Sequence, residues 1–179
     1  NGRRQMTTEV YVGAGASVGD RLDNLRRGLG ALAATPGARI VRTSPVYETE
    51  PWGYSDQSPF LNCAALFECA LGPKQLLIRL KAIESEMGRD LTAARWHPRP
   101  IDLDLLLYGE LIMRERGITV PHEYLARRWF TIRPVLDLTP DLHLPGAGKL
   151  AASLMDIPAG EMGRLVKPAL HSTAERGVA

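Results

Sequence analysis

Residues 101–108 read Ile-Asp-Leu-Asp-Leu-Leu-Leu-Tyr, a pattern typical of a β-strand that carries polar groups on one face. Side chains two positions apart on a strand point to the same side of the sheet. Asp102 and Asp104 therefore project together. The apolar side chains project the opposite way and can enter the core, and these are Ile101, Leu103, Leu105 and Leu107. The stretch predicts a strand with one buried face and two neighbouring carboxylates on the other.

The segments before this strand alternate between strand and helix patterns. Leucines at spacings of three and four from Leu22 to Leu32 indicate one face of a helix. Pro73 and Gly88 are suited to begin and end a second helix. We expect strands at 9–16, 38–48, 60–69 and 101–108 and helices at about 19–34 and 73–88. This order is that of the ferredoxin-like βαββαβ core, an α+β fold in which both helices pack on one face of an antiparallel sheet.

The rest of the chain adds smaller elements. We expect an edge hairpin at 110–120, a partly helical region from 121 to about 138 and short C-terminal helices, one of them at 149–155. No repeat or linker divides the chain, so residues 9–157 are predicted to form a single domain. Residues 1–8 and 158–179 are predicted to be flexible tails, because apolar residues become sparse beyond about residue 160.

The composition argues against several classes of protein. Among 179 residues 45% are apolar, and the formal net charge is +2, which is not the strongly basic balance of a nucleic-acid binder. The chain has no run of about 18 apolar residues and no secretory signal, so we expect no contact with a membrane. Cys63 and Cys69 would lie roughly 20 Å apart on one strand, too far for a disulfide. We expect buried thiols in a cytoplasmic, monomeric protein.

The paired aspartates suggest a metal site. Two carboxylates on an otherwise apolar strand repel each other and lose hydration, and a divalent cation between them removes that cost. Mg²⁺ suits hard oxygen ligands and usually takes one or two protein carboxylates together with substrate phosphates. Asp-x-Asp is a common pattern, however, and Asp102 and Asp104 are also compatible with the solvated face of an edge strand.

Cationic residues on both sides favour a phosphate site. Three arginines precede the aspartates, and His122, Arg127 and Arg128 follow them. Phosphoryl transfer needs metal ions that bridge phosphate oxygens and guanidinium groups that neutralise developing charge. Any one arginine is compatible with plain surface, but the set beside two paired carboxylates predicts phosphate chemistry. No Rossmann fingerprint, P-loop or nucleophile elbow is present.

A second cluster suggests recognition of a flat ring. Phe60 and Asn62 are two residues apart on a predicted strand, so they share a face. The Asn62 amide could bind the backbone, or it could read the donor–acceptor edge of a heterocycle on which Phe60 stacks. Phe130 could supply the opposite stacking face, or it could belong to the core.

The ordered motifs resemble those of the 6-hydroxymethyl-7,8-dihydropterin pyrophosphokinase family of folate biosynthesis, over about residues 9–157. The matching motifs are Tyr11-Val12-Gly13-x-Gly15, Thr49-x-Pro51-x-Gly53, Phe60-Leu61-Asn62, Glu84-x-x-x-Gly88-Arg89, Arg95-Trp96-x-Pro98-Arg99-x-Ile101-Asp102-Leu103-Asp104 and Thr119-Val120-Pro121-His122. The resemblance implies that ATP, as co-substrate, donates a pyrophosphoryl group to the hydroxymethyl oxygen of the pterin and leaves AMP.

The resemblance also implies roles for individual residues. Two Mg²⁺ ions would bind Asp102 and Asp104. Catalysis would use Arg89, Arg99, Asp102 and Asp104, with Arg89, Trp96 and Arg99 in a lid loop. The ATP site would comprise Glu84, Arg95, Trp96, Thr119, His122 and Arg128. The pterin pocket would comprise Thr49, Pro51, Trp52, Gly53, Phe60, Asn62 and Phe130.

The chain departs from the family pattern at several positions around the metal site. Leu91 stands where a second lid arginine is usual, and Pro100 replaces a common threonine. His97, Gly117 and Glu123 replace a glycine, an arginine and a tyrosine. We therefore expect a working enzyme with altered ATP affinity or product release. The alternatives are another Mg²⁺-dependent phosphoryl or nucleotidyl transferase and a non-catalytic ferredoxin-like binding module.

Overall fold

The computed structural model describes residues 6–51, 58–88 and 100–171. The elements follow in the order β1 (Thr8–Ala16), α1 (Arg21–Ala33), β2 (Ala38–Thr43), β3 (Val46–Thr49), β4 (Phe60–Cys69), α2 (Pro73–Glu86), β5 (Asp102–Tyr108), β6 (Met113–Glu115), β7 (Ile118–Val120), α3 (Trp129–Leu138), β8 (His143–Leu144), β9 (Gly148–Lys149), η1 (Leu150–Asp156), η2 (Ala159–Glu161) and β10 (Arg164–Lys167), where η1 and η2 are 3₁₀ helices.

A six-stranded antiparallel sheet forms the centre of the fold. Strands β10, β3, β4, β1 and β5 lie side by side in that order, and β2 also pairs with β4. Strands β2 and β3 share one edge of β4, because β2 pairs with its second half and β3 with its first three residues. The predicted α+β fold with an antiparallel sheet is confirmed.

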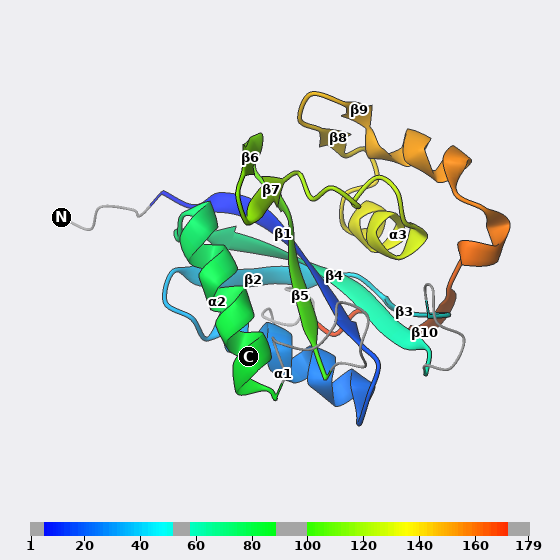
Figure 1. The fold of residues 1–179 in the computed structure, drawn as a ribbon, viewed down its shortest axis with the longest axis horizontal. Helices are drawn as coiled ribbons and strands as arrows, with labels where there is room; N and C mark the ends of the chain where they lie inside the picture. The colour runs from blue at the N-terminus through cyan, green and yellow to red at the C-terminus, as the bar shows by residue number, and fades with distance from the viewer. Residues whose placement is uncertain (1–5, 52–57, 89–99, 172–179) are drawn as a thin grey trace, which may run out of the picture.

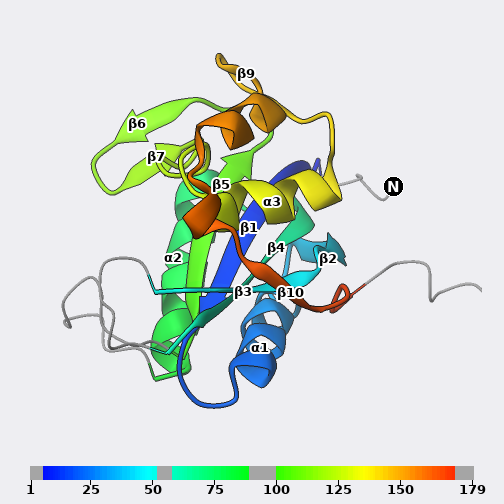
Figure 2. The ribbon, with the colours of Figure 1, turned by 90° about the vertical axis from the view of Figure 1, so that its right-hand side faces the viewer.

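Helices cover both faces of the sheet. On one face α1 and α2 bury apolar side chains that include Leu25, Leu29, Leu76, Leu80 and Ile83 against β1, β4 and β5. On the other face α3 and η1 pack around a separate apolar cluster. Figures 1 and 2 show α1 and α2 together on one side of the sheet and α3 on the other. The prediction of two helices on one face holds for α1 and α2, and α3 adds a layer on the opposite face of the sheet.

The predicted strand at 38–48 is wrong in one respect, because the structure contains two strands there. β2 ends at Thr43 and β3 begins at Val46. Pro45 has no N–H to donate to a ladder. Ser44 bridges the break, since its backbone N–H donates to the Ala64 carbonyl at 2.8 Å and its hydroxyl accepts from the Ala64 N–H at 2.9 Å.

The predicted facing of Leu107 is also wrong. Leu103 and Leu105 enter the core beneath α1 and α2, whereas Leu106 and Leu107 both belong to the cluster under α3. The register against β1 passes from Leu105 opposite Val12 to Leu107 opposite Tyr11, so Leu106 is an extra residue. Such a β-bulge reverses the alternation of faces beyond it. The alternation is intact from Ile101 to Leu105, which is where the aspartates lie.

The C-terminal segment differs from the expected tail. Residues 164–167 form β10, which pairs with β3 at the edge of the sheet. The His171 carbonyl accepts from the Thr43 N–H at 3.0 Å, and the His171 N–H donates to the Thr43 hydroxyl at 2.9 Å. Residues 164–167 and His171 therefore contact the sheet, while the single domain at 9–157 stays a prediction. The predicted short helix at 149–155 is the 3₁₀ helix η1.

Two smaller expectations concern cysteines and membranes. Cys63 and Cys69 are both free and buried, as predicted. Burial raises the pKa of the Cys63 thiol to about 12. Among the helices of the described ranges, none combines the length and the apolar character that crossing a bilayer requires.

Candidate active site

A row of matched residues crosses three neighbouring strands on the face opposite α1 and α2. Gly15 of β1 pairs with Asp102 of β5 on one side and with Asn62 of β4 on the other. Two residues along, Gly13 pairs with Asp104. Directly paired residues of antiparallel strands point to the same face. Gly13 and Gly15, called here the glycine strip, therefore add no side chain of their own to this face, and the Leu106 side chain lies 3.2 Å from a Cβ built on Gly13.

The two aspartates lie as the sequence predicts. Both are partly exposed at the start of β5. Leu103 between them points to the opposite face of the sheet, where it is completely buried. Asp104 keeps 38% of its side chain exposed. Within the described part of the chain no cluster of three or more acidic, His or Cys side chains could hold a metal ion. This donor set of two hard oxygen groups fits a Mg²⁺ ion whose remaining ligands come from substrate phosphates and water.

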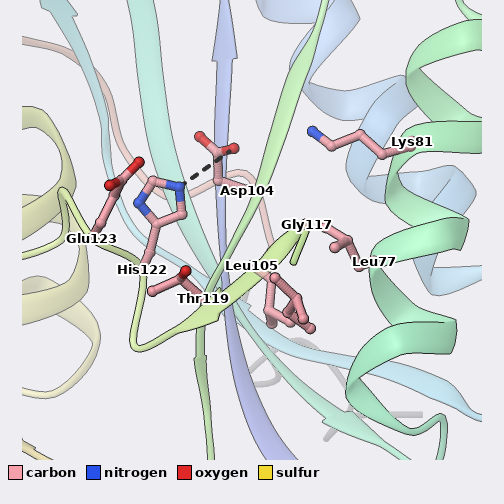
Figure 3. A pocket seen from close by; sticks show the side chains of 9 residues that line it. Leu77, Lys81, Asp104, Leu105, Gly117, Thr119, His122 and Glu123 are labelled. Carbon is pink, nitrogen blue, oxygen red and sulfur yellow. Dashed lines mark ion pairs between the residues drawn. The ribbon is translucent and has the colours of Figure 1, made fainter. Parts of the chain in front are cut away.

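A pocket of about 320 Å³ opens beside Asp104, at the outer edge of β5. Its walls come from α2, β5, β7 and the segment that follows β7, and its polar lining residues are Lys81, Asp104, Thr119, His122 and Glu123. Figure 3 shows the Lys81 ammonium and the His122 ring approaching Asp104 from opposite sides. A pocket in which an ammonium and an imidazole stand beside a carboxylate suits a metal-bound phosphate chain.

The His122 ring is oriented by its own segment. The backbone N–H of Tyr124 donates to His122 Nδ1 at 3.2 Å, so the neutral ring carries its proton on Nε2. Nε2 lies 3.9 Å from Asp104 Oδ1. The backbone N–H of His122 also donates to the Leu106 carbonyl at 2.9 Å, and this bond holds the segment against β5. His122 thus presents a donor beside the candidate metal site, consistent with the predicted contact to phosphate.

Glu84, which is predicted to contact ATP, is hydrogen-bonded to β5. Its side chain is completely buried, and Oε1 accepts from the Leu103 N–H at 2.6 Å. Lys81, which sequence reasoning missed, lies 3.1 Å from the same carboxylate. One sequence signal could have indicated this pair. Glu84 lies beside Ile83 on the buried stripe of α2, and a buried carboxylate needs a partner. Glu84 therefore holds β5 through this hydrogen bond, and its contact with ATP stays a prediction.

Asn62 is held in place by Thr49. Its Nδ2 donates to the Thr49 hydroxyl at 2.8 Å, and both residues are buried. The other end of the amide lies over the glycine strip, since a Cβ built on Gly15 would come within 3.0 Å of Asn62 Oδ1. Phe60 stands beside it, 3.9 Å from the same built atom. The expected cluster of Phe60, Asn62 and Thr49 is therefore brought together, with the Asn62 amide bonded to the Thr49 side chain.

The remaining predicted residues are spread along the other end of the site. Phe130 is partly exposed in the first turn of α3, and Pro51 is partly exposed after β3. Arg128 is buried at the start of α3, with its guanidinium 4.2 Å from the Tyr124 ring centroid and 5.8 Å from that of Phe130. Six predicted residues lie outside the described ranges and stay predictions, namely Trp52, Gly53, Arg89, Arg95, Trp96 and Arg99.

The chain is similar to several known proteins. The family model described as 7,8-dihydro-6-hydroxymethylpterin-pyrophosphokinase (HPPK) matches residues 11–140. The chain is 38% identical over 160 residues to the 2-amino-4-hydroxy-6-hydroxymethyldihydropteridine pyrophosphokinase of Pseudomonas aeruginosa, a match that covers 89% of this chain and 98% of that protein. It is 45% identical over 130 residues to the mitochondrial folate synthesis bifunctional protein of Pisum sativum, covering 73% of this chain and 25% of that protein.

A solved structure supports the fold. The crystal structure of the Plasmodium falciparum HPPK-DHPS protein aligns with a TM-score of 0.68 over 87% of this chain and 45% of that chain. At 15% sequence identity the similarity concerns the fold alone.

Proposed function

Because this chain belongs to the 7,8-dihydro-6-hydroxymethylpterin-pyrophosphokinase family, we propose that it transfers pyrophosphate from ATP to the hydroxymethyl group of 6-hydroxymethyl-7,8-dihydropterin, giving AMP and the pterin diphosphate for folate biosynthesis. One observation supports this proposal most directly. The glycine strip joins a carboxylate pair on β5 to a fixed amide on β4. A phosphate chain and a flat ring could therefore meet on one continuous surface.

The carboxylates form the metal end of this surface. Asp102 and Asp104 would hold Mg²⁺, with two ions expected from the family resemblance. When bound, Mg²⁺ neutralises phosphate oxygens and makes the phosphorus a better electrophile. His122 Nε2 and the Lys81 ammonium add donors on either side of Asp104. These groups neutralise charge and position the reactants, which is the catalysis that phosphoryl transfer requires.

The pterin end is formed by Asn62 and Phe60. The hydrogen bond from Nδ2 to Thr49 fixes the plane of the Asn62 amide before substrate arrives. A fixed amide can discriminate between ring edges, because a mismatched ring would leave buried polar atoms unpaired. We propose that Phe60 and Phe130 stack on the ring and that Pro51, Trp52 and Gly53 complete the pocket.

Arginines are proposed to complete the nucleotide site. Arg89, Arg95, Trp96 and Arg99 would act from the segment between α2 and β5, as the family resemblance implies. Arg128 and Thr119 would contact ATP near His122. Arg128 is stacked on Tyr124, so its contribution to a phosphate requires either its remaining N–H groups or a change of rotamer.

We propose that the working unit is a single domain that acts as a monomer in the cytoplasm. Its proposed partners are ATP and the pterin, without nucleic acid. The small net charge of +2 and the two buried free thiols support this reading. Size-exclusion chromatography with light scattering measures the mass directly, and a dimer would overturn the monomer.

The decisive assay separates AMP from ADP. The purified chain is incubated with ATP, Mg²⁺ and 6-hydroxymethyl-7,8-dihydropterin, and the nucleotide products are resolved by chromatography. AMP in equal amount to the pterin diphosphate is expected. ADP would mean an ordinary kinase, and no pterin-dependent product would exclude the proposed activity.

A site variant connects the activity to the carboxylates. Asp102→Ala removes one of the two proposed Mg²⁺ ligands, so turnover should fall by at least about a hundredfold. The melting temperature should stay near or above that of the parent, because the two aspartates repel each other when no metal is bound. Loss of the fold in this variant would indicate a structural role for Asp102.

A further inference from the structure

β5 is an edge strand, yet the peptide between its two aspartates is bonded on its outer side. In the described sheet β5 pairs with β1 alone. An edge strand normally leaves outward N–H and C=O groups to solvent. Here the Leu103 N–H donates to Glu84 Oε1 at 2.6 Å, and the Leu103 carbonyl accepts from Lys81 Nζ at 3.3 Å. Two side chains of α2 thus supply the donor and the acceptor that a further strand would supply.

The two side chains also depend on each other. Lys81 Nζ lies 3.1 and 3.3 Å from the two oxygens of Glu84. Glu84 is completely buried, and an ionised carboxylate there is costly without a cation and hydrogen-bond donors. Lys81 keeps 40% of its side chain exposed and reaches the pocket wall beside Asp104. The pair therefore connects the buried side of α2 to the candidate metal site.

We infer that Lys81 and Glu84 are positioning residues, a clamp that fixes the Leu103 peptide and thereby sets the directions of the Asp102 and Asp104 carboxylates. The inference rests on the proposed function, because it assigns the clamp a purpose at the metal–nucleotide site. The bond vectors of both aspartates are set by the backbone on either side of Leu103. Residues behind metal ligands typically change metal affinity by about 10- to 100-fold when removed.

Three variants separate positioning from stability. Lys81→Met keeps the aliphatic stem but removes both the donor to the Leu103 carbonyl and the ammonium beside Glu84. Lys81→Met/Glu84→Gln removes the buried carboxylate charge as well, so its melting temperature should recover toward that of the parent. Lys74→Met is the matched control, since Lys74 lies on the same helix but pairs with Glu115 at 2.5 Å on the exposed side.

The first measurement needs no metal. Amide hydrogen exchange followed by NMR in the nucleotide-free, metal-free protein reports the Leu103 N–H directly. Exchange of this amide should accelerate about tenfold or more in Lys81→Met relative to Lys74→Met. Amides of β4 should change much less. Unchanged exchange at Leu103 would overturn the clamp, whatever the protein catalyses.

The second measurement tests the purpose of the clamp. Calorimetry with Mg²⁺ and a non-hydrolysable ATP analogue should give about tenfold weaker binding in Lys81→Met. Binding should remain weak in the double variant even though its stability recovers. Binding that recovers together with the melting temperature would reduce the pair to a stability device and overturn positioning. If the parent binds no Mg²⁺–nucleotide, both the proposed function and the positioning role fail, while the exchange result still decides whether the clamp exists.

Discussion

Gly15→Ala is the sharpest test of the surface between the carboxylates and the amide. Gly15 stands in register between Asp102 and Asn62. An added Cβ would lie 3.0 Å from Asn62 Oδ1, which is closer than ordinary van der Waals contact. The nearest backbone atom to that Cβ is the Leu61 carbonyl at 3.9 Å, so only the amide has to move. The methyl group therefore acts on one side chain and leaves the strand as it is.

The size of the effect follows from the bond that Asn62 makes. A displacement of a few tenths of an ångström lengthens the 2.8 Å bond from Nδ2 to the Thr49 hydroxyl and tilts the amide plane. Loss of one neutral hydrogen bond amounts to about 1 kcal/mol. A pterin that depends on that amide should then bind about fivefold more weakly. The methyl also occupies space on the glycine strip, so the combined loss is expected to reach about tenfold.

Steady-state kinetics with each substrate varied in turn gives the answer. Gly15→Ala should raise KM for the pterin while KM for ATP stays within about twofold of the parent. Gly30→Ala is the matched control, because an added Cβ at this α1 position meets nothing within 4 Å. It should leave both KM values unchanged and raise the melting temperature slightly. An unchanged pterin KM in Gly15→Ala, or an equal rise for ATP, would refute the place given to Asn62.

Three further predictions follow from packing and burial. Gly163→Ala places a Cβ 2.6 Å from Thr49 Cγ2 and 2.8 Å from a ring carbon of Trp129. We therefore expect the free energy of unfolding, measured in urea, to fall by about 1–3 kcal/mol. KM for the pterin should rise in the same variant. A free energy of unfolding and a pterin KM that both equal those of the parent would contradict the close approach of Gly163 to β3. Burial raises the pKa of Cys63 to about 12, so its thiol should react with Ellman's reagent at pH 8 only as fast as the protein unfolds, and a rapid native reaction would contradict its burial. Burial first, and then the hydrogen bond to Asp137, raises the pKa of Tyr47 to about 12 from 10. The native state therefore keeps this proton where the unfolded chain has lost it, and the unfolding free energy should fall between pH 10 and pH 12, with a smaller slope in Tyr47→Phe.

Local periodicity was enough to predict part of the site. The common facing of Asp102 and Asp104, and that of Phe60 and Asn62, follow from the two-residue repeat of a strand. The limits of β4 and the start of α2 at Pro73 follow from equally local signals. These features were correct because nothing distant in the chain needs to be known to derive them.

Features that depend on long-range contacts were not predictable in the same way. The bulge at Leu106 arises from the register between β5 and β1, and no residue in the strand marks it. β10 is a strand only because the open edge of β3 receives it, and its own residues are all exposed. Glu84 was assigned to ATP from the family resemblance, and its hydrogen bond to the Leu103 N–H depends on how α2 packs against β5.

The glycine strip shows how a weak sequence signal acquires meaning from topology. Gly13-x-Gly15 fails as a dinucleotide-binding motif, and glycine weakens a strand interior. Both glycines nevertheless lie on the face that carries Asp102, Asp104 and Asn62, whereas Val10, Val12, Ala14 and Ala16 of β1 point to the other face. A side chain at Gly15 would fill the space between Asp102 and Asn62, because Gly15 pairs with both residues. The cost to strand stability is therefore confined to the surface on which two substrates must meet, and this is the physical reason to assign both ends of that surface to one reaction.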